Sequence, residues 1–263
     1  MTHPLNIGLL MTYNEADIID EMMAANRHAV DAIFVLDGST DGTTEKLATY
    51  PEVKHIFRDD EVVTPPERVR DYHRQVLLEA AQSTYGHGHW YTLMHGDEIF
   101  YNNPREVIAA AEQQGASRVN WAAMQFFLHT SDEATWSEKA KLSVQERLRW
   151  YSPFWVEIRQ FKATAKTHYP TGQHGKVIPA GVGWRPYSKM PIFKHYTYRS
   201  PEQVQQRMQQ QGMPGTTSSS SDIYRERYAP EYREARYFSG DFGEFEDAHL
   251  LTMLWRWRRL VKR

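Results

Sequence analysis

Hydrophobic and polar positions alternate in blocks along the first hundred residues. Short apolar runs, each bounded by turn-forming residues, predict buried strands. These runs cover residues 6–11, 32–36, 53–57 and 90–94. Between them, apolar residues recur at helical spacing. The helices are expected over residues 15–29, 43–50 and 67–81. Strands that alternate with helices predict a mostly parallel sheet with right-handed crossovers, so several strands should end along one edge.

The second half of the chain is less regular. Its pattern predicts a strand over residues 117–128, beside the acidic turn that follows residue 94, and a short strand over residues 192–196. A helix is expected over residues 143–151. Residues 209–221 form a polar, low-complexity stretch that reads as a linker, with a mobile lid as the alternative.

Composition narrows the class of protein. The 263 residues are 41% hydrophobic and 24% charged, which is typical of a globular chain long enough for one large α/β domain or two modest ones. A net charge of −2 gives no argument for a nucleic-acid partner. The absence of cysteine excludes disulfides and thiolate metal sites. The N-terminus reads as neither a signal peptide nor a membrane span, so a cytoplasmic protein is expected.

The C-terminal residues 250–263 combine Trp and Leu with five basic residues. The preferred interpretation is a helix docked on the body of the protein. The alternative is an amphipathic anchor that makes peripheral contact with the anionic inner face of a membrane, which would suit a lipid-linked acceptor.

Polar residues gather where three predicted strands end. The turns are Thr12-Tyr13-Asn14-Glu15, the segment from Asp37 to Thr43, and His95-Gly96-Asp97-Glu98. In open α/β sheets, ligands bind at this edge. Taken singly, each turn can be an ordinary loop, with Asn14 or another polar residue capping the next helix. Three of them on one edge favour a binding site.

The residue types suggest its chemistry. Asp97 and Glu98 are positioned to hold a hard divalent cation and the phosphates it carries. Tyr13 can stack on a nucleobase, and Asp37 can accept a hydrogen bond from a base or a ribose hydroxyl.

These turns resemble the motifs of the family 2 glycosyltransferases, which have the GT-A fold. Met11 to Glu15 is similar to Pro-Thr-Tyr-Asn-Glu, and Phe34 to Thr43 is similar to Val-Asp-Asp-Gly-Ser-Thr-Asp-Gly-Thr. His95 to Glu98 stands where the family has Asp-x-Asp-Glu, and 60 residues separate Asp37 from Asp97. The resemblance covers residues 5–110 and is thin afterwards.

The resemblance implies a nucleoside pocket and a basic residue facing the donor. The pocket residues would be Thr12, Tyr13, Glu15, Asp37 and Ser39, with Asp41 shaping the turn. On the helix before the acidic motif, Arg70, between Arg68 and Arg74, is the residue expected to face the donor. The alternative for these arginines is a solvated helix face.

The resemblance also implies a metal site for Mn²⁺ or Mg²⁺. Asp97 would coordinate the ion that bridges the diphosphate. His95 departs from the family pattern by replacing its first Asp, and either binds the metal or hydrogen-bonds the ribose. His195 is the candidate late histidine that completes the site, with Lys194 near the phosphates; a structural histidine is the alternative.

The catalytic base and the acceptor site stay open at this stage. The resemblance implies inversion at the anomeric carbon, which needs a carboxylate base. The candidates are Asp132, Glu133, Glu157 and the pair Glu246-Asp247. An aromatic cluster could bind an acceptor sugar, although a core role is the preferred interpretation. Its members are Trp150, Tyr151, Phe154 and Trp155.

The fold expected is therefore an α/β, GT-A-type, Rossmann-like mixed and mostly parallel sheet flanked by helices, with a C-terminal helical extension. Residues 1–110 would be the nucleotide-sugar-binding half, residues 111–200 the acceptor-binding half, and residues 201–263 the loop and extension. The expected activity is sugar transfer from a nucleotide-diphosphate sugar to a hydroxyl of a glycan or lipid-linked acceptor, as in cell-envelope or polysaccharide biosynthesis. The alternatives are a sugar-phosphate nucleotidyltransferase, although residues 9–14 lack a Gly-rich phosphate loop, and a non-catalytic nucleotide-sugar-binding protein with a degenerate metal site.

Overall fold

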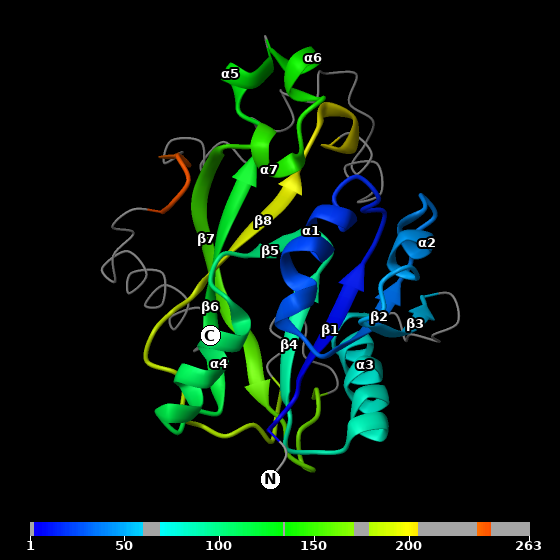
Figure 1. The fold of residues 1–263 in the computed structure, drawn as a ribbon, viewed down its shortest axis with the longest axis vertical. Coiled ribbons are helices and arrows are strands. Elements are labelled where there is room, and N and C mark those ends of the chain that lie inside the picture. The colour runs from blue at the N-terminus through cyan, green and yellow to red at the C-terminus, as the bar shows by residue number, and fades with distance from the viewer. Residues whose placement is uncertain (1–2, 60–68, 134, 171–178, 205–235, 243–263) are drawn as a thin grey trace.

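The structure is a computed structural model that describes residues 3–59, 69–133, 135–170, 179–204 and 236–242 (Figure 1). The predicted segments 209–221 and 250–263 lie outside these residues, as do Arg68 and the pair Glu246-Asp247. The first half has the elements β1 (Asn6–Thr12), α1 (Ile19–Asn26), η1 (Arg27–Ala29), β2 (Ala32–Asp37), α2 (Thr43–Leu47), β3 (Val53–Arg58), α3 (Val69–Tyr85), β4 (Trp90–His95), β5 (Glu98–Phe100) and α4 (Pro104–Gln113). The second half has β6 (Arg118–Phe127), α5 (Thr130–Glu133), α6 (Trp136–Lys139), α7 (Val144–Arg147), β7 (Trp150–Lys162), β8 (Ile192–Tyr198) and β9 (Arg236–Tyr237).

All the described strands belong to one nine-stranded sheet with the order β3-β2-β1-β4-β7-β6-β8-β5, and β9 pairs with β7. The strands from β3 to β4 in this order run parallel, in the 3-2-1-4 arrangement of a Rossmann-like sheet. β7 then pairs antiparallel with both β4 and β6, while β6 and β8 are parallel. The predicted α/β class with a mixed sheet is confirmed.

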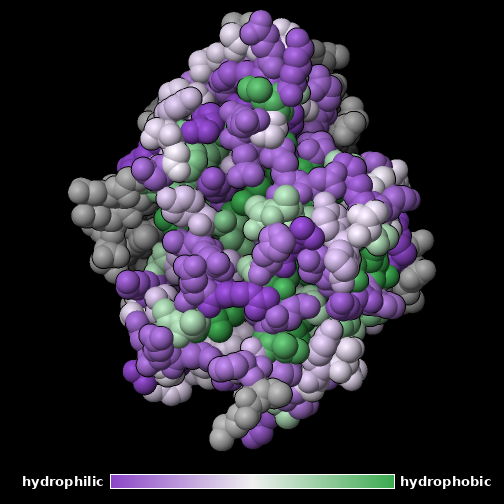
Figure 2. Space-filling view, viewed as in Figure 1, coloured by the Kyte–Doolittle hydropathy of each residue, from purple (hydrophilic) through white to green (hydrophobic). Residues whose placement is uncertain are grey.

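Helices cover both faces of the parallel half of the sheet. Successive side chains of a strand point to opposite faces, so each strand feeds two hydrophobic clusters. Leu10 of β1 packs in one cluster with Ile19 and Met22 of α1, whereas Leu9 packs in the other with Leu77 of α3. A third cluster joins α4 to β6. The face seen in Figure 2 is mostly hydrophilic, with hydrophobic residues in small separate patches.

None of the described helices combines the length and the apolar character needed to cross a bilayer.

The first helix begins later than the sequence predicts. It starts at Ile19 rather than at residue 15, and Asn14 does not cap it. Asn14 instead has a left-handed backbone (φ 54°), and its side-chain oxygen accepts a hydrogen bond from the backbone N–H of Thr40 (2.8 Å). The backbone N–H of Asn14 donates to the Ser39 hydroxyl (2.8 Å). Tertiary hydrogen bonds to the next turn therefore replace the local cap.

The largest error of the sequence-based topology concerns β7. Residues 150–162 form a 13-residue strand, whereas a helix was expected over residues 143–151; the helix covers only Val144–Arg147, behind a capping box at Ser143. β7 lies between β4 and β6, so the strand predicted beside the acidic turn is one strand further away. β7 carries buried Arg159 and Gln160 next to Phe161, and this mixture hides the alternation that marks an ordinary strand.

Candidate functional site

The three polar turns do meet at one edge of the sheet. In the register of the parallel strands, Thr12 pairs with Asp37, and Met11 pairs with His95. The backbone N–H of Gly38 donates to the Thr12 carbonyl (3.3 Å), and that of Gly96 donates to the Met11 carbonyl (3.3 Å). The C-terminal ends of β1, β2 and β4 are therefore hydrogen-bonded to one another beyond the last residues of the strands.

The turn after β2 is organised around the Asp37 carboxylate, which is fully buried. One of its oxygens accepts hydrogen bonds from the backbone N–H (2.9 Å) and the hydroxyl of Ser39. The other accepts from the Thr44 hydroxyl and from the Arg58 guanidinium (3.0 Å). Arg58 also donates to the Ser39 carbonyl (2.7 Å). Arg58 was missed in the sequence, although it ends the third strand at the same edge.

Asp41 connects the turn after β2 to the turn after β1. Its carboxylate accepts hydrogen bonds from the Ala16 N–H (3.0 Å) and from the Thr43 N–H and hydroxyl (3.1 and 2.6 Å). Burial raises the pKa of Asp41, but these hydrogen bonds outweigh burial, and the pKa falls below its usual value. The neighbouring Gly42 has φ 93°, a conformation that favours glycine.

Glu15 connects the turn after β1 to the turn that carries Gly96 and Asp97. Its backbone N–H donates to the Thr43 hydroxyl (3.0 Å), and its carboxylate accepts from the Thr12 hydroxyl (2.8 Å). A Cβ atom on Gly96 would lie only 2.0 Å from Glu15 Oε2 and 2.7 Å from Thr12 Oγ1. Glycine at position 96 is therefore what lets the buried Glu15 carboxylate lie directly against the backbone beside Asp97.

Replacement of Gly96 by Ala is expected to destabilise the protein by about 1–3 kcal/mol, because the added methyl group displaces the Glu15 carboxylate from its hydrogen bond with Thr12. The measurement is the free energy of unfolding in urea. The matched control is the same substitution in a Glu15→Ala background, where the obstructing group is gone and the cost should be smaller. An equal cost in both backgrounds would contradict this account of Gly96.

Asp97 and His195 form the centre of the site. Asp97 is 3% exposed, and its Oδ2 lies 3.2 Å from His195 Nε2. His195 Nδ1 lies 2.8 Å from Gln125 Oε1, while the Gln125 amide nitrogen donates to the carbonyls of Phe126 and His195 (3.2 and 3.3 Å). Nδ1 is therefore the donor to Gln125, and a neutral imidazole keeps its lone pair on Nε2, toward Asp97.

This arrangement fits a divalent cation. A carboxylate oxygen and an imidazole lone pair that face each other are both acceptors, so a proton or a cation between them turns repulsion into attraction. The hydroxyl of Thr197 lies 2.8 Å from Nε2 and 3.0 Å from Nδ1 of the same ring, so it contacts the imidazole without lying along the Nε2 lone pair. For metal–ligand bonds of about 2.1 Å, neighbouring octahedral ligands are roughly 3 Å apart. The 3.2 Å between Asp97 Oδ2 and His195 Nε2 matches that separation.

A buried ion network stands beside this pair. Glu98 is 1% exposed, and its Oε1 lies 2.6 Å from Arg159 Nη2 and 3.0 Å from His95 Nδ1. Arg159 is fully buried, with its guanidinium 4.5 Å from the centroid of the Phe193 ring. Its Nε also lies 2.6 Å from Glu157 Oε1, an ion pair without the angle of a hydrogen bond. The network therefore links β7 to the acidic turn.

Glu98 is held through only one of its two carboxylate oxygens. His95, Asp97 and Glu98 form a cluster whose ligand atoms lie within 4.8 Å of one another. Oε1 of Glu98 contacts Arg159 and, as part of an ionised carboxylate, accepts from His95 Nδ1, whereas Oε2 is buried without a hydrogen-bond partner among the described residues. Nδ1 of His95 then carries the proton, and its Nε2 lone pair is left for a ligand. Glu98 therefore orients His95 through Oε1, while its Oε2 stays available as a ligand beside Asp97 and the two histidines.

The pKa of Glu98 predicts acid-sensitive stability. Burial alone would raise the pKa, but Arg159 and the imidazoles of His95 and His195 lower it to about 2. Since the folded pKa lies below the unfolded one, the contribution is complete above pH 4.5 and is lost as the pH falls toward 2. It should amount to about 3 kcal/mol over this window. Urea unfolding at pH 6 and pH 3 should show a loss of about 2 kcal/mol, since part of the contribution remains at pH 3. Glu98→Gln should flatten the difference; an unchanged pH dependence in that variant would refute the assignment.

A buried arginine holds the β8 side of the site against the first turn. Arg199 is fully buried and donates to both oxygens of Asp17 (2.8 and 2.8 Å) and to the Tyr196 carbonyl (3.0 Å). The backbone N–H of Tyr196 in turn donates to the Asp97 carbonyl (2.8 Å). These bonds fix the strand that carries His195 relative to the turn that carries Glu15.

The structure places the other predicted site residues in different environments. Tyr13 is 52% exposed, and its ring covers Gly38, where an added Cβ would lie 3.0 Å from the ring. Arg70 lies in α3, but its side chain is outside the described part of the structure. Arg74 is buried, so a solvated helix face does not apply to it. Lys194 was expected near the phosphates; it lies instead in an aromatic cluster, with Nζ 4.4 Å from the centroid of the Phe238 ring.

Lys194 is on the opposite side of β8 from His195, because neighbouring residues of a strand face opposite sides. Burial among aromatic rings, with a smaller contribution from Arg149, lowers the pKa of Lys194 to about 8. Of the predicted aromatic cluster of β7, Tyr151 belongs to the core, whereas Trp150 and Trp155 are partly buried. Tyr151 is 4% exposed and stacks on Phe126, with ring centroids 5.4 Å apart.

Comparisons with known proteins leave the function open. No protein-family model and no curated protein matches this chain. A solved structure described as a glucose-1-phosphate thymidylyltransferase from Bacillus anthracis, in complex with sucrose, is similar with a TM-score of 0.28 and 9% identity. The match covers 47% of this chain and 56% of that one, so it spans about half of the neighbour. A likeness at this level does not distinguish between functions.

Proposed function

We propose that this protein is an inverting, metal-dependent glycosyltransferase. In this proposal it moves a sugar from a nucleotide-diphosphate sugar to a hydroxyl group of a glycan or lipid-linked acceptor. The supporting observation is the 3.2 Å approach of Asp97 Oδ2 and His195 Nε2 at the sheet edge that also carries the Asp37 and Glu15 turns. With a lipid-linked acceptor, residues 250–263 would act at the membrane surface.

Asp97 and His195 would hold Mn²⁺ or Mg²⁺, with His95 as a further ligand. When bound, such an ion supplies positive charge to the diphosphate as it leaves. Gln125 keeps the Nε2 lone pair of His195 available, and Glu98 does the same for His95.

The nucleoside would bind over the first two turns. Tyr13 is the exposed ring at this edge and would stack on the base. The Asp37 carboxylate is saturated by Ser39, Thr44 and Arg58, so a hydrogen bond from the nucleoside to Asp37 would have to displace one of these donors. Thr12 and Glu15 would line the side of the pocket next to Gly96.

Glu157 is the base in this proposal and would take the proton from the acceptor hydroxyl. Its side chain is 30% exposed, and it lies on β7, the strand next to β4. Arg159 contacts both Glu157 and the Glu98–His95 pair, which brings this carboxylate to the same edge of the sheet. Asp132, by contrast, is 1% exposed and paired with Lys139. The Glu133 side chain lies outside the described residues.

The test is calorimetric titration of the full-length protein with UDP and GDP, with and without Mn²⁺. One nucleotide should bind, and the affinity should depend on Mn²⁺. Asp97→Asn should lose this dependence on Mn²⁺. Its matched control is Asp20→Asn, because Asp20 is a surface residue on α1 whose side chain is 55% exposed and paired with Lys46. If neither nucleotide binds in the presence of Mn²⁺, the proposal fails.

Assays of catalytic turnover distinguish the proposed glycosyltransferase from a nucleotidyltransferase and from a non-catalytic binding protein. Hydrolysis of a panel of sugar nucleotides should release one nucleoside diphosphate and so identify the donor. Pyrophosphate release from a nucleoside triphosphate and a sugar phosphate would instead indicate a nucleotidyltransferase. Binding without either reaction, with a range of glycan acceptors present, would indicate a non-catalytic nucleotide-sugar-binding protein.

A further inference from the structure

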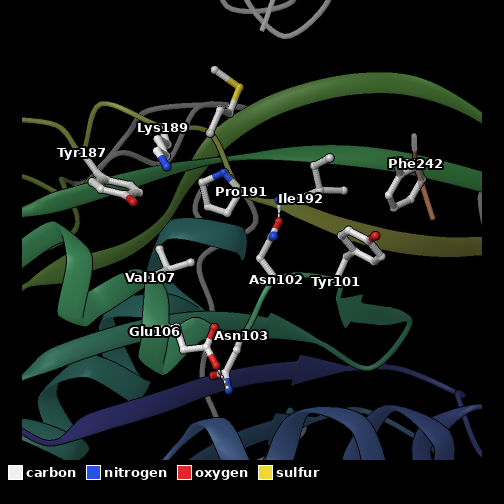
Figure 3. A pocket seen from close by; sticks show the side chains of 11 residues that line it. Tyr101, Asn102, Asn103, Glu106, Val107, Tyr187, Lys189, Pro191, Ile192 and Phe242 are labelled. Atoms are coloured by element: carbon white, nitrogen blue, oxygen red, sulfur yellow. Dashed lines mark hydrogen bonds between the residues drawn. The ribbon is translucent and has the colours of Figure 1, made fainter. Parts of the chain in front are cut away.

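We infer that a cavity between β5, α4 and the segment leading into β8 binds an uncharged sugar ring. The cavity has a volume of about 390 Å³, within the range of small-molecule sites. Figure 3 shows its walls, with Tyr187 and Lys189 on one side, Tyr101 and Phe242 on the other, and Asn102 between them. Neither the proposed metal ligands nor the nucleoside turns line it.

The floor of this cavity is built from reciprocal hydrogen bonds. The backbone N–H groups of Tyr101 and Asn102 both donate to the Ile192 carbonyl (3.0 and 3.3 Å). The Ile192 N–H donates to the side-chain oxygen of Asn102 (2.8 Å). This fixes the Asn102 side chain and leaves its amide nitrogen without a partner among the described residues. A donor is therefore held ready before any ligand arrives.

Two opposite charges complete the polar lining. Within the described part of the chain, the Glu106 carboxylate accepts only a 3.5 Å hydrogen bond from Asn103, and the Lys189 ammonium has no protein partner. The two do not pair with each other. Together they offer carboxylate acceptors and three ammonium donors with no net charge.

The aromatic residues supply apolar surfaces. Tyr101 is 39% exposed, and its ring is held edge-on against Phe242, with centroids 4.8 Å apart at 80°. Tyr187 faces it across the cavity. A sugar ring presents apolar C–H faces and a rim of hydroxyls, and both find partners here.

Other ligand classes fit less well. A phosphate or diphosphate would meet the Glu106 carboxylate and only one cation, Lys189, so repulsion would offset much of the attraction. An alkyl chain would bury the polar groups of Asn102, Glu106 and Lys189 without hydrogen bonds, at a cost for each. The mixture of single donors and acceptors with aromatic surfaces favours a neutral sugar.

The cavity is distinct from the proposed reaction centre. Ile192 is three residues before His195 on β8, which corresponds to about 10 Å at the usual rise of a strand. Binding there does not depend on Asp97, on a metal or on a nucleotide. Sugar binding in this cavity can therefore be tested separately from the proposed glycosyltransferase activity.

The test uses the metal-free, full-length protein and protein-observed NMR titrations. The probes are glucose, galactose, mannose, N-acetylglucosamine, maltose and cellobiose, with glucosamine and glucuronate as charged counterparts. At least one neutral probe should bind at millimolar concentration. Tyr187→Ala and Glu106→Gln should each weaken that binding by about tenfold, whereas Asp97→Asn should leave it unchanged.

Glu106 and Lys189 are exposed, so their variants should fold, and overlaid amide spectra verify this. Lys189→Met provides an independent variant on the opposite wall. The inference is overturned if no neutral probe binds, if only the charged sugars bind, or if the Tyr187, Glu106 and Lys189 variants all bind as the native protein does. Loss of sugar binding in Asp97→Asn would also overturn it, because it would place the sugar in the reaction centre.

Discussion

Replacement of Asp97 by Asn is expected to lower kcat/KM for the sugar nucleotide by about a thousandfold. The change keeps the shape of the side chain but removes the charge that faces His195 Nε2 at 3.2 Å. A neutral amide oxygen is a weaker ligand for a hard cation, so the concentration of Mn²⁺ needed for half-maximal activity should rise as well.

The measurement is sugar-nucleotide turnover as a function of Mn²⁺ concentration. His195→Gln should raise the Mn²⁺ requirement in the same direction, because it replaces the other proposed ligand, which lies 3.2 Å from Asp97. Asp20→Asn should behave as the native protein, since Asp20 is a surface residue on α1. If Asp97→Asn keeps the native dependence on Mn²⁺, the assignment of Asp97 as a metal ligand is wrong.

Replacement of Arg159 by Met is expected to destabilise the protein by about 3–5 kcal/mol. Arg159 is fully buried between Glu98 and Glu157, so its loss leaves a buried carboxylate without a counter-charge. Met keeps the aliphatic part of the side chain but not the guanidinium that lies over Phe193, so a triple variant is needed to separate the charge from the packing. Chemical denaturation at neutral pH measures the change.

A residue on the same strand provides the matched control. Lys162 on β7 pairs with Glu112 at 2.8 Å, but both side chains are more than a third exposed. Lys162→Met should cost less than about 1 kcal/mol, because water screens this pair. Adding Glu98→Gln and Glu157→Gln to Arg159→Met should recover much of the stability. A failure to recover would mean that packing, rather than charge, is what Arg159 contributes.

The sequence predicts most of the strands in the parallel half of the sheet. β1, β2 and β4 lie close to the apolar runs that predict them, because a strand buried on both faces is a continuous apolar block. β3 also lies close to its predicted run, although it is an edge strand and only partly buried. The convergence of the Thr12, Asp37 and Asp97 turns followed from the parallel topology alone. Boundaries were less accurate, since α1 begins at Ile19 after tertiary hydrogen bonds have claimed Asn14.

The mixed half of the sheet could not be read in the same way. β7 contains Arg159 and Gln160, both fully buried, and a buried ion or amide looks like a surface residue in sequence. Without β7, neither the insertion of a strand next to β4 nor the counter-charge of Glu98 could be foreseen. Lys194 shows the converse error: it adjoins a site residue in sequence yet faces the other side of the sheet.

The sequence by itself determined the α/β class, the edge at which the polar turns meet, and the choice of Asp97 and His195 as partners worth testing. The first two conclusions rest on local periodicity and on the rule that parallel strands end together. The choice of Asp97 and His195 rests on the resemblance to the family 2 glycosyltransferases. The tertiary structure alone decided that Asp97 and His195 are in contact, that Glu98 serves Arg159 and His95, and that Asp37 is saturated by its own turn. Hydrogen bonds and ion pairs act over a few ångströms between residues far apart in the chain, and local sequence patterns carry no record of those distances.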